Sequence, residues 1–371
     1  MTKNPTYLDH NATTPLRATA LNAVMSVLSE VGNPSSIHSF GRRARKHIET
    51  ARQQIADSLD VSSGQVFFNS GATEGNNTIL KGFSGQRILM SAIEHSSAID
   101  CTVSRNLVPV TVDGVVDLNA FEQMAHDIRP ALVSIMLVNN ETGVIQPIAE
   151  TSRIAKSVGA LVHCDAVQAY GRIPFTREEL GVDFLTLSSH KIGGPQGVGA
   201  IITSPGITLP KLLEGGGQER RSRAGTENTA GITGFGAAAA EASSKISDFQ
   251  KLGLFRDKIE EQILKSPSVK IYGQNGPRVA NTTFCTINRV SGETLLMAFD
   301  IEGIAISSGS ACSSGTVKPS HVLRAIGDAM GINTGHSLAS LRISLGHTTT
   351  EKDIEHFIKV WNTIGTRLLK D

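Results

Sequence analysis

Between residues 66 and 202 the sequence alternates short apolar runs with stretches of helical pattern, and this alternation constrains the fold more than any other feature. The apolar runs cover residues 66–69, 87–90, 131–136, 161–165, 185–188 and 199–202. Strands that alternate with helices in this way join as neighbours in a mainly parallel sheet with helices on both faces. The sequence therefore predicts an α/β protein.

A second, smaller domain is predicted toward the end of the chain. A chain of 371 residues exceeds what one hydrophobic core usually serves. Beyond about residue 250 the pattern changes to shorter strands and helices. We expect a large domain over residues 15–250 and a small α+β domain made of residues 1–14 and 251–371, the first residues returning to it as a strand.

Two helices are predicted near the start of the large domain. The first is expected to have Thr14 as its cap and Pro15 as its first residue, which are the residue types favoured at those positions. The second is basic and amphipathic and is expected to run from Ser39 to about Leu59.

Composition and charge exclude several classes of protein. The formal net charge is +1, and no apolar stretch approaches the roughly 20 residues of a membrane span. The first residues lack the apolar core of a signal peptide. The cysteines, Cys101, Cys164, Cys285 and Cys312, contain no CxxC pair, so neither a disulfide framework nor a zinc site is indicated. We expect a cytoplasmic protein that binds neither nucleic acid nor membrane directly.

Polar side chains gather where the predicted strands end. Because the carboxyl ends of parallel strands meet at one edge of a sheet, these residues are expected to line one rim, where ligands of open α/β sheets bind. They are Thr73, His95, Asn140, Asp165, Ser188, His190 and Lys191.

Three of these features together suggest a cofactor. Residues 70–73 begin a helix and offer free N–H groups to an anion, although an ordinary helix cap is the alternative. No nucleotide-binding GxxxxGK[ST] or GxGxxG motif is present. Asp165 is suited to a pyridinium nitrogen or to capping a helix. Lys191, which taken alone would be a surface lysine, is suited to a Schiff base. A phosphate site, a carboxylate and a lysine are what pyridoxal phosphate requires.

Among the other polar residues, His95 and Arg342 have two interpretations each. His95 is either a ring stacked on a flat cofactor or a histidine that begins a helix. Gln168 and Asn140 are neutral donors suited to a phenolate oxygen. Arg342 lies inside an apolar strand pattern, where it would bind a substrate carboxylate or form a salt bridge.

Cys312 is the second chemical feature. Serine and glycine surround it from residue 307 to residue 315, which is typical of an exposed loop, whereas Cys164 and Cys285 have apolar neighbours. A surface cysteine without function is the alternative, but exposed free thiols are a liability. We interpret Cys312 as a nucleophile.

Seven motifs in order match a known family. They are Tyr7-Leu8-Asp9-His10-Asn11-Ala12-Thr13-Thr14-Pro15, Asn33-Pro34-Ser35-Ser36-Ile37-His38, Ser70-Gly71-Ala72-Thr73-Glu74, Asn139-Asn140-Glu141-Thr142-Gly143, Ser188-Ser189-His190-Lys191, Gly309-Ser310-Ala311-Cys312 and Leu341-Arg342-Ile343-Ser344-Leu345-Gly346. Nearly end to end, the chain resembles the cysteine desulfurases of the NifS/IscS type, members of the class V aminotransferase family. Their fold is aspartate-aminotransferase-like (fold type I), with a mainly parallel seven-stranded sheet in the large domain.

The resemblance implies a role for each candidate residue. Lys191 would hold pyridoxal 5'-phosphate as a Schiff base, and Arg342 with Asn140 would receive the carboxylate of L-cysteine. Cys312 would take the sulfur as a persulfide and leave L-alanine. The remaining cofactor contacts would be Asp165 to the pyridine nitrogen, Gln168 to the ring oxygen, His95 stacked on the ring, and Ala72, Thr73, Ser188, His190 and Thr226 around the phosphate, Thr226 coming from the other subunit of a homodimer.

The resemblance also implies partners and leaves rival interpretations. The sulfur would pass to an iron–sulfur scaffold protein of the IscU/NifU type or to a tRNA-thiolation acceptor, and Cys312 could itself ligate a cluster on such a scaffold; no other metal site is predicted. Glu227-Asn228 after Thr226 and His347 after Gly346 depart from some relatives, which leaves the subgroup open. Rivals are an aminotransferase or selenocysteine lyase of the same fold, and a non-catalytic scaffold protein.

Overall fold

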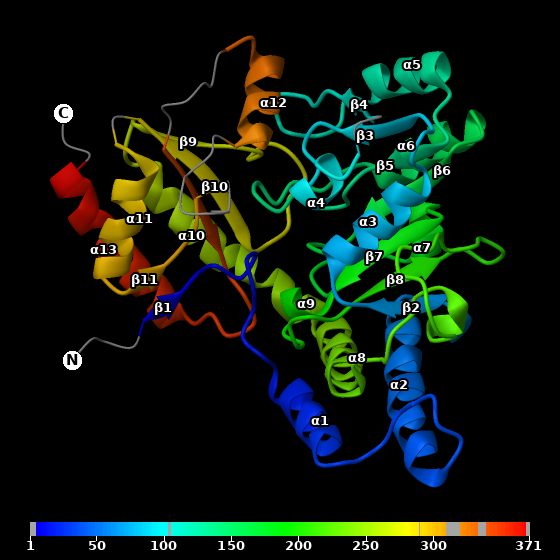
Figure 1. The fold of residues 1–371 in the computed structure, drawn as a ribbon. Helices are drawn as coiled ribbons and strands as arrows, with labels where there is room; N and C mark the ends of the chain where they lie inside the picture. Colours follow the sequence, from blue (N-terminus) through cyan, green and yellow to red (C-terminus); the bar gives the residue numbers. More distant parts are fainter. Residues whose placement is uncertain (1–4, 103–104, 289, 309–319, 333–338, 369–371) are drawn as a thin grey trace.

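The computed structural model describes residues 5–102, 105–288, 290–308, 320–332 and 339–368. Its largest element is a seven-stranded sheet with the strand order β2-β8-β7-β6-β5-β3-β4 (Figure 1). The strands are β2 (Val66–Asn69), β3 (Ile88–Ser91), β4 (Arg105–Val108), β5 (Leu132–Ser134), β6 (Leu161–Asp165), β7 (Phe184–Ser188) and β8 (Gly199–Thr203). β8 is antiparallel to both of its neighbours, and the other neighbouring strands are parallel. The prediction of a mainly parallel seven-stranded sheet is confirmed.

Helices pack against this sheet, and α8 packs between α1 and α2 (Figure 1). The buried apolar side chains of the strands form the main core with these helices. The helices are α1 (Ala18–Leu28), α2 (Ser39–Ser58), α3 (Ala72–Gly82), α4 (Ser96–Ile99), α5 (Leu118–Ile128), α6 (Ile148–Ser157), α7 (Arg177–Leu180) and α8 (Thr229–Ser244), with 3-10 turns η1 (Ser63–Gln65), η2 (Ser189–Lys191) and η3 (Glu219–Arg221).

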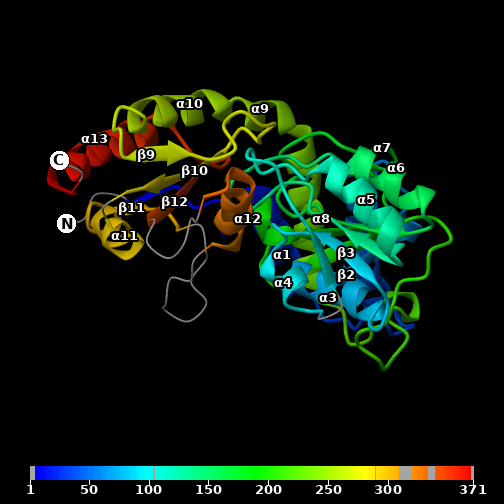
Figure 2. The ribbon, with the colours of Figure 1, turned by 90° about the horizontal axis from the view of Figure 1, so that it is seen from above.

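The rest of the chain builds smaller sheets beside the first one (Figure 2). An antiparallel sheet has the order β12-β10-β9, and a parallel pair joins β1 to β11. The strands are β1 (Thr6–Tyr7), β9 (Val269–Ile271), β10 (Thr282–Ile287), β11 (Ile304–Ala305) and β12 (Ala339–Ser344). The helices are α9 (Ile246–Gln250), α10 (Leu252–Ile263), α11 (Gly292–Ile301), α12 (His321–Met330) and α13 (Glu351–Leu368). The rings of Phe299, Phe357 and Trp361 stack in their core. The division after residues 14 and 250 stays a prediction.

The start of the first helix differs from the prediction. α1 begins at Ala18 and not at Pro15, and Arg17, with extended backbone, is its N-cap residue. The reason is that residues 14–17 run along the loop that follows β7. The Thr14 N–H donates to the carbonyl of His190 at 3.1 Å, and the Arg17 N–H donates to the carbonyl of Gly193 at 2.8 Å. The predicted helix from Ser39 is confirmed and ends at Ser58.

Among the residues that the structure describes, no helix combines the length and the apolar character that a bilayer crossing requires.

Candidate active site

A cavity of about 480 Å³ opens at the carboxyl ends of the parallel strands. Most residues predicted from the sequence surround it: Ala72, Thr73, His95, Asn140, Asp165, Gln168, Ser188, His190, Lys191 and Arg342. Thr226 lies elsewhere in the same chain, in a smaller cavity with Asn69 and Arg223. Cys312 lies outside the described residues.

Lys191 projects into this cavity from η2, which directly follows β7. Its Nζ donates to the main-chain carbonyls of Asn11 and Ala12, each at 2.7 Å. Burial, followed by the positive charges of Arg342 and Arg172, lowers the pKa of the amine to about 7. At neutral pH a large fraction of this amine is therefore unprotonated, as a nucleophile or base requires.

Asp165 ends β6 and is 6% exposed. Its Oδ2 accepts from Asn76 Nδ2 at 2.8 Å, and its Oδ1 accepts from the N–H of Val167 at 3.0 Å. Asn76 lies in α3 and also donates to Ser97 Oγ at 2.9 Å. We did not predict a role for Asn76; its position one turn after Ala72, on a helix that begins at the cavity, was the available signal.

The interpretation of His95 as a histidine that begins a helix is confirmed, and its stacking on a cofactor stays a prediction. His95 is the N-cap residue of α4, since its Nδ1 accepts from the N–H of Ser97, and its side chain lines the cavity. Burial lowers the pKa of this ring and keeps it neutral. Because Nδ1 is an acceptor, the ring proton lies on Nε2.

The start of α3 lines the cavity and has features suited to an anion. Gly71 has a φ of 146°, which favours glycine, and it precedes the first helical residue, Ala72. The first N–H groups of a helix have no partner within it, and the helix dipole places positive charge there. Glu74 in the same turn does not neutralise the site, because its carboxylate accepts from Arg223 and from the N–H of Ser70.

Gln168 and His190 are held by the N-terminal segment of the chain. Gln168 Nε2 donates to the carbonyl of Asn11 at 3.0 Å, while its buried Oε1 has no hydrogen-bond partner among the described residues. His190 Nδ1 lies 3.1 Å from Thr13 Oγ1. Burial lowers the pKa of His190 to about 4, so its ring is neutral.

Arg342 reaches the cavity from β12 in the small sheet. Its Nη2 donates to Asp9 Oδ1 at 2.8 Å, and its Nη1 donates to the carbonyl of Asn140 at 3.1 Å. The salt bridge that we considered therefore exists. The buried Nε has no partner among the described residues, so the guanidinium keeps a donor for another acceptor.

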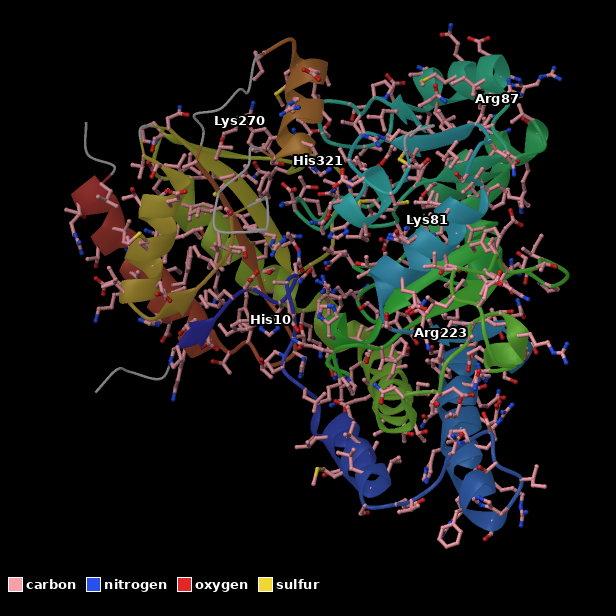
Figure 3. The ribbon with its side chains drawn as sticks, in the orientation of Figure 1. His10, Lys81, Arg87, Arg223, Lys270 and His321 are labelled. Carbon is pink, nitrogen blue, oxygen red and sulfur yellow. The ribbon has the colours of Figure 1, made fainter. Side chains whose placement is uncertain are left out.

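These residues fit pyridoxal phosphate. A largely neutral lysine amine, a carboxylate and the first residues of a helix line one cavity. Gln168 and Arg342 line it too, and each has a buried polar atom without a partner among the described residues. Side chains of both parts of the molecule meet in this region, where His10 lies on the segment that passes between them and His321 on α12 faces the large part (Figure 3).

With this fold and this site, the chain belongs to the class-V aminotransferase family, whose sequence model matches residues 6–357. It is similar to the cysteine desulfurase IscS of Dictyoglomus turgidum, with 40% identity over 99% of this chain and 96% of that protein. An IscS-like cysteine desulfurase of Mycobacterium tuberculosis is 38% identical over 95% of this chain and 94% of its own length. The X-ray structure of a NifS-like protein from Rickettsia africae superposes with a TM-score of 0.90 at 40% identity, covering 98% of this chain and 100% of that one.

Proposed function

We propose that this protein is a pyridoxal-phosphate-dependent cysteine desulfurase that converts L-cysteine to L-alanine and retains the sulfur. The observation that carries this proposal is one cavity in which a lysine amine with a pKa of about 7 lies with Asp165 and Arg342. Full-length similarity to cysteine desulfurases supports the substrate, as does a 29% identical structure, SspA, in complex with cysteine.

The residues around the cavity have distinct roles toward the cofactor in this proposal. Lys191 would hold it covalently, Asp165 would pair with its ring nitrogen, and His95 would stack on the ring. Gln168 would reach the ring oxygen. The phosphate would bind at the start of α3, with contacts from Ala72, Thr73, Ser188, His190 and, from the partner subunit, Thr226.

The chain's own groups then act on the substrate. Arg342 and Asn140 would orient its carboxylate, and Lys191, once free, would take the proton from its Cα. Bound pyridoxal phosphate supplies an electron sink for the charge left at that carbon. The thiolate of Cys312 would attack the substrate sulfur; the carbon–sulfur bond breaks with its electrons left on carbon, and protonation there gives alanine.

The experiment that tests this function separates its two nucleophiles. Cys312→Ser is expected to keep the yellow cofactor and to lose release of sulfide from cysteine, because only the sulfur acceptor is missing. Lys191→Ala is the matched variant and is expected to lose both turnover and the covalent cofactor link. Mass spectrometry of wild-type Cys312 after incubation with L-cysteine should show added sulfur. Full sulfide release by Cys312→Ser would contradict the assignment.

We further propose a cytoplasmic homodimer that passes sulfur to an iron–sulfur scaffold of the IscU/NifU type or to a tRNA-thiolation acceptor. Support for the dimer comes from Thr226, which does not line its own chain's cavity, and from exposed apolar side chains near α1, where Met25 is 59%, Leu28 65% and Val31 80% exposed. Light scattering of the purified protein should give twice the mass of the chain. Sulfur labelled in cysteine should appear on an added scaffold protein.

A further inference from the structure

Asn11 is the most extensively bonded residue beside the proposed cofactor lysine, and no role was predicted for it. It is 2% exposed, and every one of its polar atoms has a partner. Its main-chain carbonyl accepts from Lys191 Nζ at 2.7 Å and from Gln168 Nε2 at 3.0 Å. Asn11 therefore contacts two of the proposed cofactor residues through one oxygen atom.

The Asn11 side chain fixes the position of that oxygen. Its Nδ2 donates to Thr282 Oγ1 at 3.0 Å and to the carbonyl of Asn140 at 3.2 Å. Its Oδ1 accepts from Arg172 Nη1 at 2.6 Å and from Asn281 Nδ2 at 3.1 Å. A side chain bonded at both ends to four separate groups leaves the adjacent carbonyl little freedom to move.

Arg172 strengthens this arrangement. It is 3% exposed and forms no ion pair with a carboxylate of the described residues, and its Nη2 is also directed at the main-chain carbonyl of Lys191, at 3.5 Å. One guanidinium thus holds Asn11 and the backbone of the lysine together. Its uncompensated charge also disfavours a second cation at the Lys191 amine.

The acceptors around Lys191 Nζ match a neutral amine. A neutral amine has two N–H bonds and one lone pair, whereas an ammonium group has three N–H bonds. The carbonyls of Asn11 and Ala12 accept two hydrogens, and no third acceptor for Nζ occurs among the described residues. With both hydrogens bound to fixed carbonyls, the lone pair is left for a reaction partner in the cavity.

We propose that Asn11 is a positioning residue that orients the free amine of Lys191 with its lone pair available, by fixing the carbonyl pair to which this amine donates. The proposal rests on the proposed function, because it assumes that Lys191 reacts with pyridoxal phosphate. In this proposal Asn11, which is far from Lys191 in the sequence, is one of the residues that prepare the lysine amine for reaction.

The test follows Schiff-base formation in full-length apoenzyme mixed with pyridoxal phosphate. In this reaction the amine nitrogen adds to the aldehyde carbon and water leaves, and visible absorbance reports the rate. Asn11→Ala is expected to slow the reaction about 10- to 100-fold, since small displacements of reacting groups have effects of this size. Pyridoxamine phosphate lacks the aldehyde and cannot form the link, so its affinity reports the pocket alone and is expected to stay within about threefold of wild type.

A matched pair on β10 keeps the test decisive if Asn11→Ala does not fold. Thr282→Val removes an acceptor for Asn11 Nδ2, while Thr283→Val removes a neighbouring buried hydroxyl that donates to Glu260 instead. Thr282→Val should slow Schiff-base formation about threefold or more, and Thr283→Val should match wild type.

Two results would overturn the role of Asn11. One is a wild-type rate in both Asn11→Ala and Thr282→Val. The other is an equal loss of pyridoxamine phosphate affinity, which would mean that Asn11 shapes the pocket and not the amine. Failure of the proposed function would give other results. The wild-type apoenzyme would form no Schiff base, or Cys312 would gain no sulfur although the Asn11 variants still formed the Schiff base more slowly than wild type.

Discussion

Lys191 differs from most lysines because burial and neighbouring charge act on its amine in the same direction. Arg342 and Arg172 both disfavour the ammonium form, and Asp9 and Asp165 oppose them only in part. An ordinary lysine, with a pKa of about 10.4, is almost fully protonated at neutral pH. The amine of Lys191 can therefore act as a base and as a nucleophile without a separate group that removes its proton.

At the residue scale, we predict the pH dependence of Schiff-base formation in the apoenzyme. The rate should rise with pH through about 7, because the neutral amine that reacts is formed there and not near pH 10. Arg342→Gln should move the midpoint to higher pH by removing a positive charge, and Asp9→Asn should move it lower. Stopped-flow absorbance from pH 5.5 to 10 measures all three proteins. A common midpoint for the variants would contradict this electrostatic account.

Among the structural elements, η3 departs most from ordinary backbone geometry. Glu219, Arg220 and Arg221 have φ values of 42°, 55° and 67°, which cost non-glycine residues roughly 1–2 kcal/mol each. The carboxylate of Glu219 receives both Nη atoms of Arg52 at 2.8 Å and the N–H of Phe68 at 2.9 Å. This buried pair holds the strained turn against α2 and β2.

At the element scale, we predict that Arg52→Met lowers the free energy of unfolding by about 3–5 kcal/mol, because it leaves the Glu219 carboxylate buried without its partner. Arg45→Met on the same helix is the control. Its ion pair with Glu49, at 3.2 Å, is exposed and should contribute less than about 1 kcal/mol. Urea denaturation of the three proteins measures the difference. Equal losses of unfolding free energy in Arg52→Met and Arg45→Met would contradict the prediction that burial makes the Arg52–Glu219 pair more important.

Over the whole molecule, several buried or half-buried histidines stay neutral. Burial is the largest cause in each case, and it lowers the pKa of His10 to about 3 and the pKa values of His163 and His190 to about 4. In the unfolded chain these groups have the ordinary value of about 6.5. Between pH 6.5 and 4.5 the unfolded state therefore binds protons that the native state does not, and stability falls as the pH falls.

Two buried carboxyl groups act in the opposite direction. Burial raises the pKa of Glu94 to about 8 and that of Glu141 to about 7, so the native state keeps two protons that the unfolded state releases above pH 4.5. The three histidines outnumber these two groups. We predict a lower thermal unfolding midpoint at pH 4.5 than at pH 6.5, measured by calorimetry, and a smaller drop in His163→Gln, which removes a fully buried ring. A midpoint that rises over this range would contradict the prediction.

The sequence could indicate residues whose position follows from local pattern, and not those that depend on distant contacts. Asp165 ends β6 and Lys191 lies in the turn directly after β7, and the alternation of strands and helices brings such strand ends together. Asn11 acquires its partners only in the folded chain, since 271 residues separate it from Thr282 and 161 from Arg172. The predicted start of α1 was wrong for the same reason, since residues 14–17 bond to the distant loop after β7 and do not continue the helix. The cofactor and the activity could be predicted from the motifs. The residues of these motifs are suited to the chemistry of the site, which helix and strand propensities do not reflect.

The hydrogen bonds of Asn11 also bear on how the protein is made. Asn11 leaves the ribosome well before its partners Thr282 and Ser344, which follow it by 271 and 333 residues. At 5–20 residues per second, the delay is on the order of tens of seconds. Until then the carbonyls that hold the lysine amine lack these partners, so we expect the large sheet to form before the site can bind the cofactor. Loading with pyridoxal phosphate should therefore follow the synthesis of β12, which holds Ser344.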